Sequence, residues 1–231
     1  MVTKNKGPAE AGGASAELRK CSRAEIKRYR CDYDLVKVYM ECSRHDQKIR
    51  DYMIYLIATT DYCDRRRAPY ILSSLLMLGA NPNATYRRRP VFKMVLDNIG
   101  GGSLEQVIYG MRIAILFVSH GVDVNTRDRR GNTLLHYATQ YSWALGEWIV
   151  ADLLQLGADP NIRNKNGETP LHVAVRSGGD VVGKIKVIKT LLEHGADPHI
   201  RDKNGKTPLD YATDDVAEVL RAKVETASLK R

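Results

Sequence analysis

Short apolar segments recur along the chain, and each ends at a glycine followed by polar residues. Four of them align: LLMLGANPN (75–83), LFVSHGVDVN (116–125), LLQLGADPN (153–161) and LLEHGADPH (191–199). The glycines are separated by 42, 36 and 38 residues. A glycine after an apolar run predicts a helix that ends in a left-handed residue, a conformation that glycine adopts at little cost. The pattern therefore predicts helices repeated along the chain.

A second block follows each of the last three glycines. Its copies are RDRRGNTLLHYA (127–138), RNKNGETPLHVA (163–174) and RDKNGKTPLDYA (201–212), and TYRRRPVFKMV (85–95) is a degraded copy that lacks the glycine. Threonine followed by proline, as in Thr169-Pro170, predicts a helix start, because the hydroxyl can cap free amides and the ring fixes φ for the first turn. Pro90 and Pro208 stand at equivalent positions. The glycine inside each block predicts a reversing turn.

These two blocks resemble the ankyrin repeat, with its pattern D-x-x-G-x-T-P-L-H, a helix, and then LLxxGADPN. The resemblance covers residues 49–213 and implies an all-α solenoid of helix-turn-helix units with projecting β-hairpin loops. A single unit cannot bury its apolar face, so neighbouring units must stack to form a core. The resemblance implies that the following residues are structural: Gly79, Gly121, Gly131, Thr133, His136, Gly157, Gly167, Thr169, Pro170, His172, Gly195, Gly205, Thr207 and Pro208.

The repeats are longer than the family's usual period of about 33 residues. We expect the extra residues between the two helices of a unit, as in 97–106 and 176–184. Such irregular lengths resemble the host-interacting ankyrin proteins of large viruses and intracellular bacteria, which implies a role in host–pathogen interaction.

The chain ends frame this array. Residues 1–24 predict a disordered basic tail, and apolar residues at helical spacing predict an N-terminal capping helix over 25–48. The array itself, 49–213, holds about four to five units, of which the first is degenerate. Residues 214–231 predict a C-terminal capping helix and tail.

Composition agrees with a folded, soluble protein. Of the 231 residues 43% are hydrophobic, and the formal net charge is +9. Apolar stretches are about six residues long, far below the ~18 needed to cross a bilayer. Because no apolar segment follows the N-terminal lysines, we expect no secretory signal and an intracellular protein, cytoplasmic or nuclear.

We find no pattern that predicts catalysis, a metal or a cofactor. The four cysteines (Cys21, Cys31, Cys42 and Cys63) lack the short spacing of zinc ligands. Gly100 to Gly102 lie between expected helices, where a phosphate-binding loop would need a strand before it. His136 and His172 recur at one repeat position, which favours a structural role. We therefore expect a non-catalytic scaffold.

The hairpin regions are strongly basic. Four windows, 87–89, 127–130, 163–168 and 201–206, hold eleven basic and three acidic residues. This charge favours a protein partner with an acidic face. Family members generally grip partners by hairpin tips and the exposed side of the first helix, which names these residues: Arg88, Arg89, Arg129, Arg130, Asn132, Gln140, Tyr141, Trp143, Lys165, Asn166, Glu168, Arg176, Ser177, Lys203, Asn204 and Lys206.

For some residues in and near the repeats we expect a role other than partner binding. Arg127, Arg163 and Arg201 share one repeat position just before the turn, which favours an architectural role. We expect Trp148 and Leu156 in the core, and the chain to be a monomer.

Three alternatives stay open. The basic loop tips can simply be a solvated edge. The charge also fits nucleic acid, although no nucleic-acid motif is present and the basic residues are not interleaved with aromatics. Third, the segment Leu18 to His45 could make the protein an adaptor that recruits other machinery, although a capping role is the simpler interpretation.

Overall fold

The structure is a computed structural model, and it describes residues 47–58, 68–99, 103–142 and 147–228. The chain divides into two compact units, residues 1–91 and 92–231, called here the N-terminal and C-terminal units. Most of the expected capping helix 25–48, the tail 1–24 and all four cysteines lie outside the described residues. Among the described helices, none is both long and apolar enough to cross a bilayer.

The N-terminal unit contains a helix pair and a short hairpin. Helix α4 (Gln47–Ala58) packs on α5 (Ala68–Met77), and strands β1 (Thr85–Tyr86) and β2 (Arg89–Pro90) pair antiparallel. The core between the helices includes Met53, Ile57 and Leu72, all fully buried. The ring of Tyr86 stacks on Tyr55 with centroids 3.7 Å apart, which ties the hairpin to α4.

The hairpin of the N-terminal unit has a two-residue loop, Arg87 and Arg88, with φ of 50° and 64°. Two positive φ angles in a two-residue loop describe a type I′ turn, which normally takes Asn-Gly. The missing glycine noted in the sequence therefore does not prevent a hairpin here. Two arginines adopt the left-handed conformation instead.

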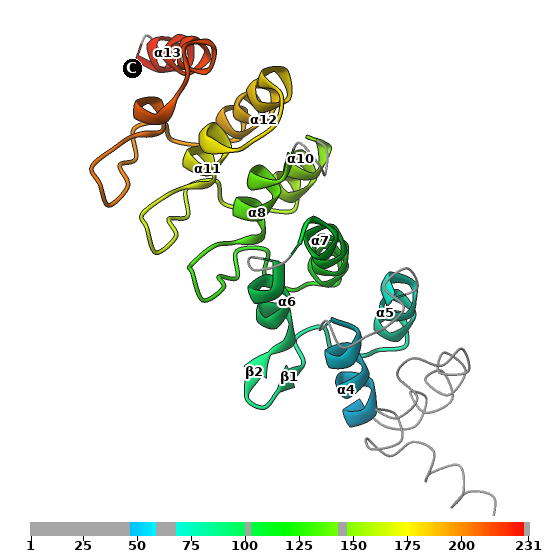
Figure 1. Cartoon of the computed structure of the whole chain (residues 1–231). Coiled ribbons are helices and arrows are strands. Elements are labelled where there is room, and N and C mark those ends of the chain that lie inside the picture. The colour runs from blue at the N-terminus through cyan, green and yellow to red at the C-terminus, as the bar shows by residue number, and fades with distance from the viewer. Residues whose placement is uncertain (1–46, 59–67, 100–102, 143–146, 229–231) are drawn as a thin grey trace, which may run out of the picture. The chain divides into compact units, whose positions relative to one another are not determined.

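The C-terminal unit is a stack of helix pairs with loops projecting from one side (Figure 1). Its first pair is α6 (Val91–Ile99), which begins at the last residue of the N-terminal unit, and α7 (Leu104–Ser119). The remaining elements are α8 (Leu134–Gln140), α10 (Trp148–Gln155), α11 (Pro170–Arg176), α12 (Val181–Glu193), the 3₁₀ helix η1 (Pro208–Tyr211) and α13 (Asp214–Ser228).

The helices form two rows. Inner elements α8, α11 and η1 pack in sequence, and outer helices α10, α12 and α13 pack in sequence behind them. Val187, Ile188, Leu191 and Leu192 of α12 are buried in this stack, as the apolar spacing predicts. Burial of each such side chain contributes about 1.5–3 kcal/mol. An all-α repeat solenoid, predicted from the sequence, is confirmed.

Two residues expected in the core are on the surface. Trp148 is 59% exposed and Leu156 is 46% exposed. Both predictions were wrong because α10 turns Ile149, Val150 and Leu153 inward, which leaves the first residue of the helix and its C-terminal cap outside the buried stripe.

The last repeat also differs from the others. Its inner element is a single 3₁₀ turn, Pro208–Tyr211, where α8 and α11 each have seven residues. Ala212 is extended, and α13 begins two residues later at Asp214. The short connection leaves no room for a longer inner helix.

Candidate functional site

Three hairpin loops of the C-terminal unit share one backbone geometry. They comprise residues 128–132, 164–168 and 202–206, and in each the first backbone N–H donates to the last carbonyl, at 2.8–2.9 Å. The fourth residue of each loop is a glycine with φ of 73–79°. Adjacent loops are joined through their backbones, because Lys165 N–H donates to Arg130 O and Lys203 N–H to Asn166 O, both at 2.9 Å.

The arginine that precedes each loop links neighbouring hairpins. Arg163 Nε donates to Gly167 O at 3.1 Å, and its terminal nitrogen donates to Arg201 O at 2.8 Å. Arg127 makes the same two contacts, to Gly131 O and Arg163 O. Arg201, at the last hairpin, donates to Gly205 O. These contacts are those of a structural side chain, so the guanidinium groups hold the hairpins in register.

A histidine anchors the start of α8 and of α11. Nδ1 of His172 accepts from the backbone N–H of Thr169 at 3.1 Å and from its hydroxyl at 2.9 Å. A ring nitrogen that accepts two hydrogen bonds carries no proton, so the other nitrogen, Nε2, donates to Lys206 O at 3.2 Å. His136 repeats this arrangement with Thr133 and Glu168 O.

Burial keeps both histidines neutral. It lowers the pKa of His136 from 6.5 to about 4 and lowers the pKa of His172, although the hydrogen bond to the next hairpin's carbonyl opposes the shift in each case. In the last repeat Asp210 accepts from the same two groups of Thr207. These rings are therefore part of the solenoid's architecture.

A carboxylate or amide closes each hairpin from inside. Asp128 accepts from two loop N–H groups and from the hydroxyl of Tyr137, and burial together with that hydrogen bond raises the pKa of Tyr137. Asp202 is arranged likewise, and the Tyr211 hydroxyl, at 2.6 Å, lowers the pKa of Asp202 to about 2. Two of the three acidic residues of the hairpin windows thus face inward.

The middle repeat replaces this pair. Asn164 closes its hairpin, and Val173 stands where the other repeats have tyrosine. The Asn164 amide donates to Asn132 Oδ1 and Glu168 Oε2, both at 3.0 Å. Because valine is smaller than tyrosine, the surface is hollowed at this repeat.

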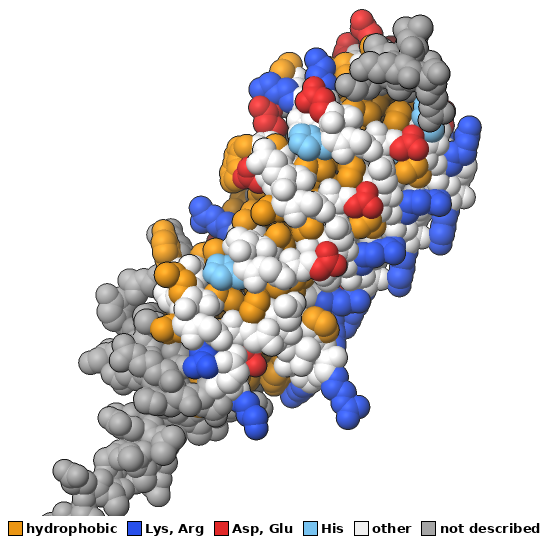
Figure 2. Space-filling model, turned by 180° about the vertical axis from the view of Figure 1, so that it is seen from behind, with side chains coloured by type: hydrophobic (Ala, Val, Ile, Leu, Met, Phe, Trp, Pro, Cys, Tyr) orange, Lys and Arg blue, Asp and Glu red, His pale blue; other side chains and the backbone are white. Residues whose placement is uncertain are grey.

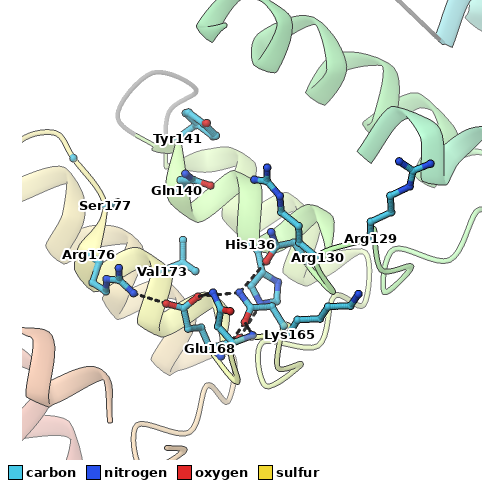
Figure 3. A pocket seen from close by; sticks show the side chains of 14 residues that line it. Arg129, Arg130, His136, Gln140, Tyr141, Lys165, Glu168, Val173, Arg176 and Ser177 are labelled. Carbon is cyan, nitrogen blue, oxygen red and sulfur yellow. Dashed lines mark hydrogen bonds and ion pairs between the residues drawn. The ribbon is translucent and has the colours of Figure 1, made fainter. Parts of the chain in front are cut away.

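The hollow is an open groove of about 720 Å³ between α8 and α11, and the 14 residues that line it come from the segments 129–141 and 164–178 (Figure 3). We call it the α8–α11 groove. Ten of the residues predicted to bind a partner line it: Arg129, Arg130, Asn132, Gln140, Tyr141, Lys165, Asn166, Glu168, Arg176 and Ser177. Residues separated by up to about fifty positions in sequence thus meet at one surface.

The α8–α11 groove is basic. It is lined by Arg129, Arg130, Lys165 and Arg176 against a single carboxylate, Glu168. Arg176 pairs with Glu168 and lies over the ring of Tyr211, with its guanidinium carbon 5.1 Å from the centroid. Arg129, at the opposite rim, pairs with Asp97 of α6 at 3.4 Å. Among the described residues Lys165 has no ion-pair partner, so its charge is available to a ligand.

Lys and Arg side chains gather along one edge of the molecule in the space-filling view, and the acidic side chains visible there are fewer (Figure 2). The hairpin residues Arg129, Arg130, Lys165 and Lys203 of the C-terminal unit are all exposed. An opposite charge on a partner would be attracted to this edge.

Six of the predicted binding residues lie elsewhere. Arg88 and Arg89 belong to the N-terminal unit, and Trp143 lies outside the described residues. Lys203, Asn204 and Lys206 belong to the last hairpin, where Lys206 lies over the Tyr211 ring, 5.2 Å from its centroid. Ser177 lines the groove but is 9% exposed and donates to Ala174 O, so its hydroxyl is used within the fold.

Sequence reasoning missed Asn164, Val173 and Gly178 as lining residues, and it predicted only a structural role for the fourth, His136. A signal for two of them exists in the aligned blocks: Asp128 and Tyr137 recur as Asp202 and Tyr211, whereas the middle copy has Asn164 and Val173. The joint replacement of aspartate and tyrosine by Asn164 and Val173 identifies the middle repeat as the one whose surface differs from that of its neighbours. In the described ranges no group of three His, Cys, Asp or Glu residues could hold a metal ion.

The comparison with protein families agrees with the repeated geometry. A family model described as ankyrin repeats (3 copies) matches residues 143–228, which include α10, α11, α12, η1 and α13. A search of curated proteins gives no match to the chain. The hairpins, the Thr–His anchors and the stacked helix pairs extend the same pattern to α8 and its hairpin. Residues 143–228 are therefore ankyrin repeats, the family that the sequence pattern resembles.

Proposed function

We propose that the protein is a non-catalytic scaffold that binds an acidic face of a protein partner in the α8–α11 groove. Ankyrin repeats are generally protein–protein interaction modules, and the family is typically non-catalytic. The observation that carries the proposal is the concentration of four basic side chains around one carboxylate in an open groove. The carboxylates of the hairpin windows that could offset this charge, Asp128 and Asp202, are buried and hydrogen-bonded.

Several features of the groove suit a protein ligand. Tyr141 and Arg176 belong to the residue types that dominate binding hot spots, and both line the groove. The stacked hairpins supply a rigid platform, because backbone hydrogen bonds and arginine side chains join each to the next. A rigid surface loses little conformational freedom on binding. The mechanism is occupation or bridging of the partner by a monomer in an intracellular compartment.

Affinity capture tests the proposal. We would compare the wild-type protein with a variant that carries Arg130→Glu and Lys165→Glu, and with a control that carries Lys189→Glu and Arg221→Glu. The control reverses the same number of charges on α12 and α13, outside the groove. We expect one or more proteins, identified by mass spectrometry, to be captured by the wild type and the control and lost from the groove variant.

Two results would contradict the proposal. Equal capture by all three proteins would show that the basic edge is merely solvated. Capture that disappears after nuclease treatment of the lysate would show that nucleic acid is the ligand. Circular dichroism of the three proteins verifies that each is folded.

A further inference from the structure

The middle repeat of the C-terminal unit breaks a pattern that its neighbours keep. Tyr137 and Tyr211 each donate a hydroxyl hydrogen bond to the aspartate that closes their hairpin. Val173 cannot do so, and Asn164 turns its amide to Asn132 and Glu168 instead. The substitution of tyrosine by valine therefore removes a ring and a hydroxyl from the groove at one position.

This change creates an apolar seat in polar surroundings. Val173 is half-buried and lies between Gln140 of α8 and Glu168 of its own repeat (Figure 3). Among the described residues that line the groove it is the one aliphatic side chain. The ring of Tyr141 also lines the groove, beyond Gln140 from Val173 (Figure 3). An apolar side chain of a ligand that packs on Val173 would be removed from water, which favours binding.

Basic groups flank this seat on two sides. Arg130 and Lys165 come from adjacent hairpins, and Arg176 comes from the end of α11, next to the seat. The side-chain amide of Gln140 has no hydrogen-bond partner in the part of the chain that the structure describes, so it can donate to or accept from a peptide backbone.

We propose that the α8–α11 groove binds an extended acidic segment of the partner, with one apolar side chain seated on Val173 and carboxylates on both sides of it. This rests on the proposed function and adds the form of the ligand. An extended chain advances about 3.3 Å per residue, and packed helices lie about 8–10 Å apart. Carboxylates within about three residues of the apolar side chain would therefore reach the flanking basic groups.

The test uses peptides. A phage-displayed library of random linear peptides is selected on the immobilised wild-type protein. The affinity of each enriched peptide for the wild type and the variants is then measured in solution by fluorescence anisotropy. The groove-filling variant is Val173→Tyr, which restores the residue type of the neighbouring repeats. The matched control is Val182→Tyr, the same substitution at an exposed position of α12 that does not line the groove.

We expect enriched peptides to contain Asp or Glu on both sides of one apolar residue. Their affinity should fall roughly tenfold to a hundredfold on Val173→Tyr, because a buried apolar contact is lost, and should be unchanged on Val182→Tyr. Val173→Thr keeps the shape of valine and adds a hydroxyl. It should weaken binding severalfold, and it keeps the test decisive if Val173→Tyr does not fold.

Two outcomes would overturn the inference. The first is an acidic peptide that binds Val173→Tyr and Val173→Thr as tightly as the wild type. The second is the absence of enrichment, or enrichment of peptides without acidic residues. The proposed function fails separately, because its own test depends on Arg130→Glu and Lys165→Glu and uses whole partner proteins.

Discussion

At the scale of the residue, the recurring histidine shows how a titratable group serves architecture. His136 and His172 each accept two hydrogen bonds at Nδ1 and donate one from Nε2 to the next hairpin. Their recurrence and the resemblance to the ankyrin repeat predict a structural role, and Asp210 at the same position shows which part of the arrangement a carboxylate can replace. The hydrogen bond from Nε2 to the carbonyl of the next hairpin requires a donor, which an ionised aspartate lacks.

The neutral histidines predict how stability depends on pH. Burial lowers the pKa of His136 to about 4, so between pH 6.5 and 4 the unfolded state binds a proton that the folded state does not. The contribution of His136 to the free energy of unfolding therefore falls as the pH decreases through this interval. At 1.36 kcal/mol per pKa unit, the loss from His136 is about 3 kcal/mol. Urea titrations at several pH values measure it.

The variant His136→Asn provides the comparison. It should be less stable than the wild type at pH 7, because the hydrogen bond to Glu168 O is lost or weakened. It should also lose less stability between pH 6.5 and 4.5. Parallel curves for the two proteins would show that His136 does not carry the pH dependence.

At the scale of the element, glycine and threonine–proline signals were sufficient to predict the repeated helices. Those signals are local, since a helix end or start depends on a few neighbouring residues. The two-arginine turn of the first hairpin was not predictable in this way, because its left-handed residues are not glycines. The exposure of Trp148 could not be predicted from the sequence either, because apolar character alone does not tell which face of α10 meets the stack.

Hairpin stacking predicts that equivalent glycines differ in their tolerance of substitution. A Cβ atom at Gly167 would lie 2.9 Å from Lys203 N, whereas one at Gly205 would meet no atom within 4 Å. Both glycines have positive φ, so Gly167→Ala and Gly205→Ala share the backbone strain, about 1 kcal/mol. Gly167→Ala adds a clash with the next hairpin and should be the more destabilising, by about 1–3 kcal/mol.

Denaturation midpoints of these two variants, measured beside the wild type, give the comparison. Equal midpoints for Gly167→Ala and Gly205→Ala would mean that the hairpins are not held in close contact in solution.

At the scale of the whole molecule, the sequence predicted the class of fold and the sign of the charge, and it named most residues of the groove. Repeat position was enough for this, because equivalent residues of stacked repeats lie on one surface. The shape of the groove could not be predicted in the same way. The shape depends on Asn164 and Val173, which differ from the equivalent residues of the neighbouring repeats. Alignment of the repeats on their shared residues does not reveal such differences.

The most direct test of the central claim is the affinity of the captured partner, measured at low and at physiological salt for the wild type, the Arg130→Glu/Lys165→Glu variant and the Lys189→Glu/Arg221→Glu control. Steering by exposed charges is screened by salt. We predict that the wild type and the control bind alike and weaken as salt rises, and that the groove variant binds at least about tenfold more weakly, with a smaller dependence on salt. Equal affinity of the groove variant and the control at both salt concentrations would contradict the claim that the α8–α11 groove is the binding site.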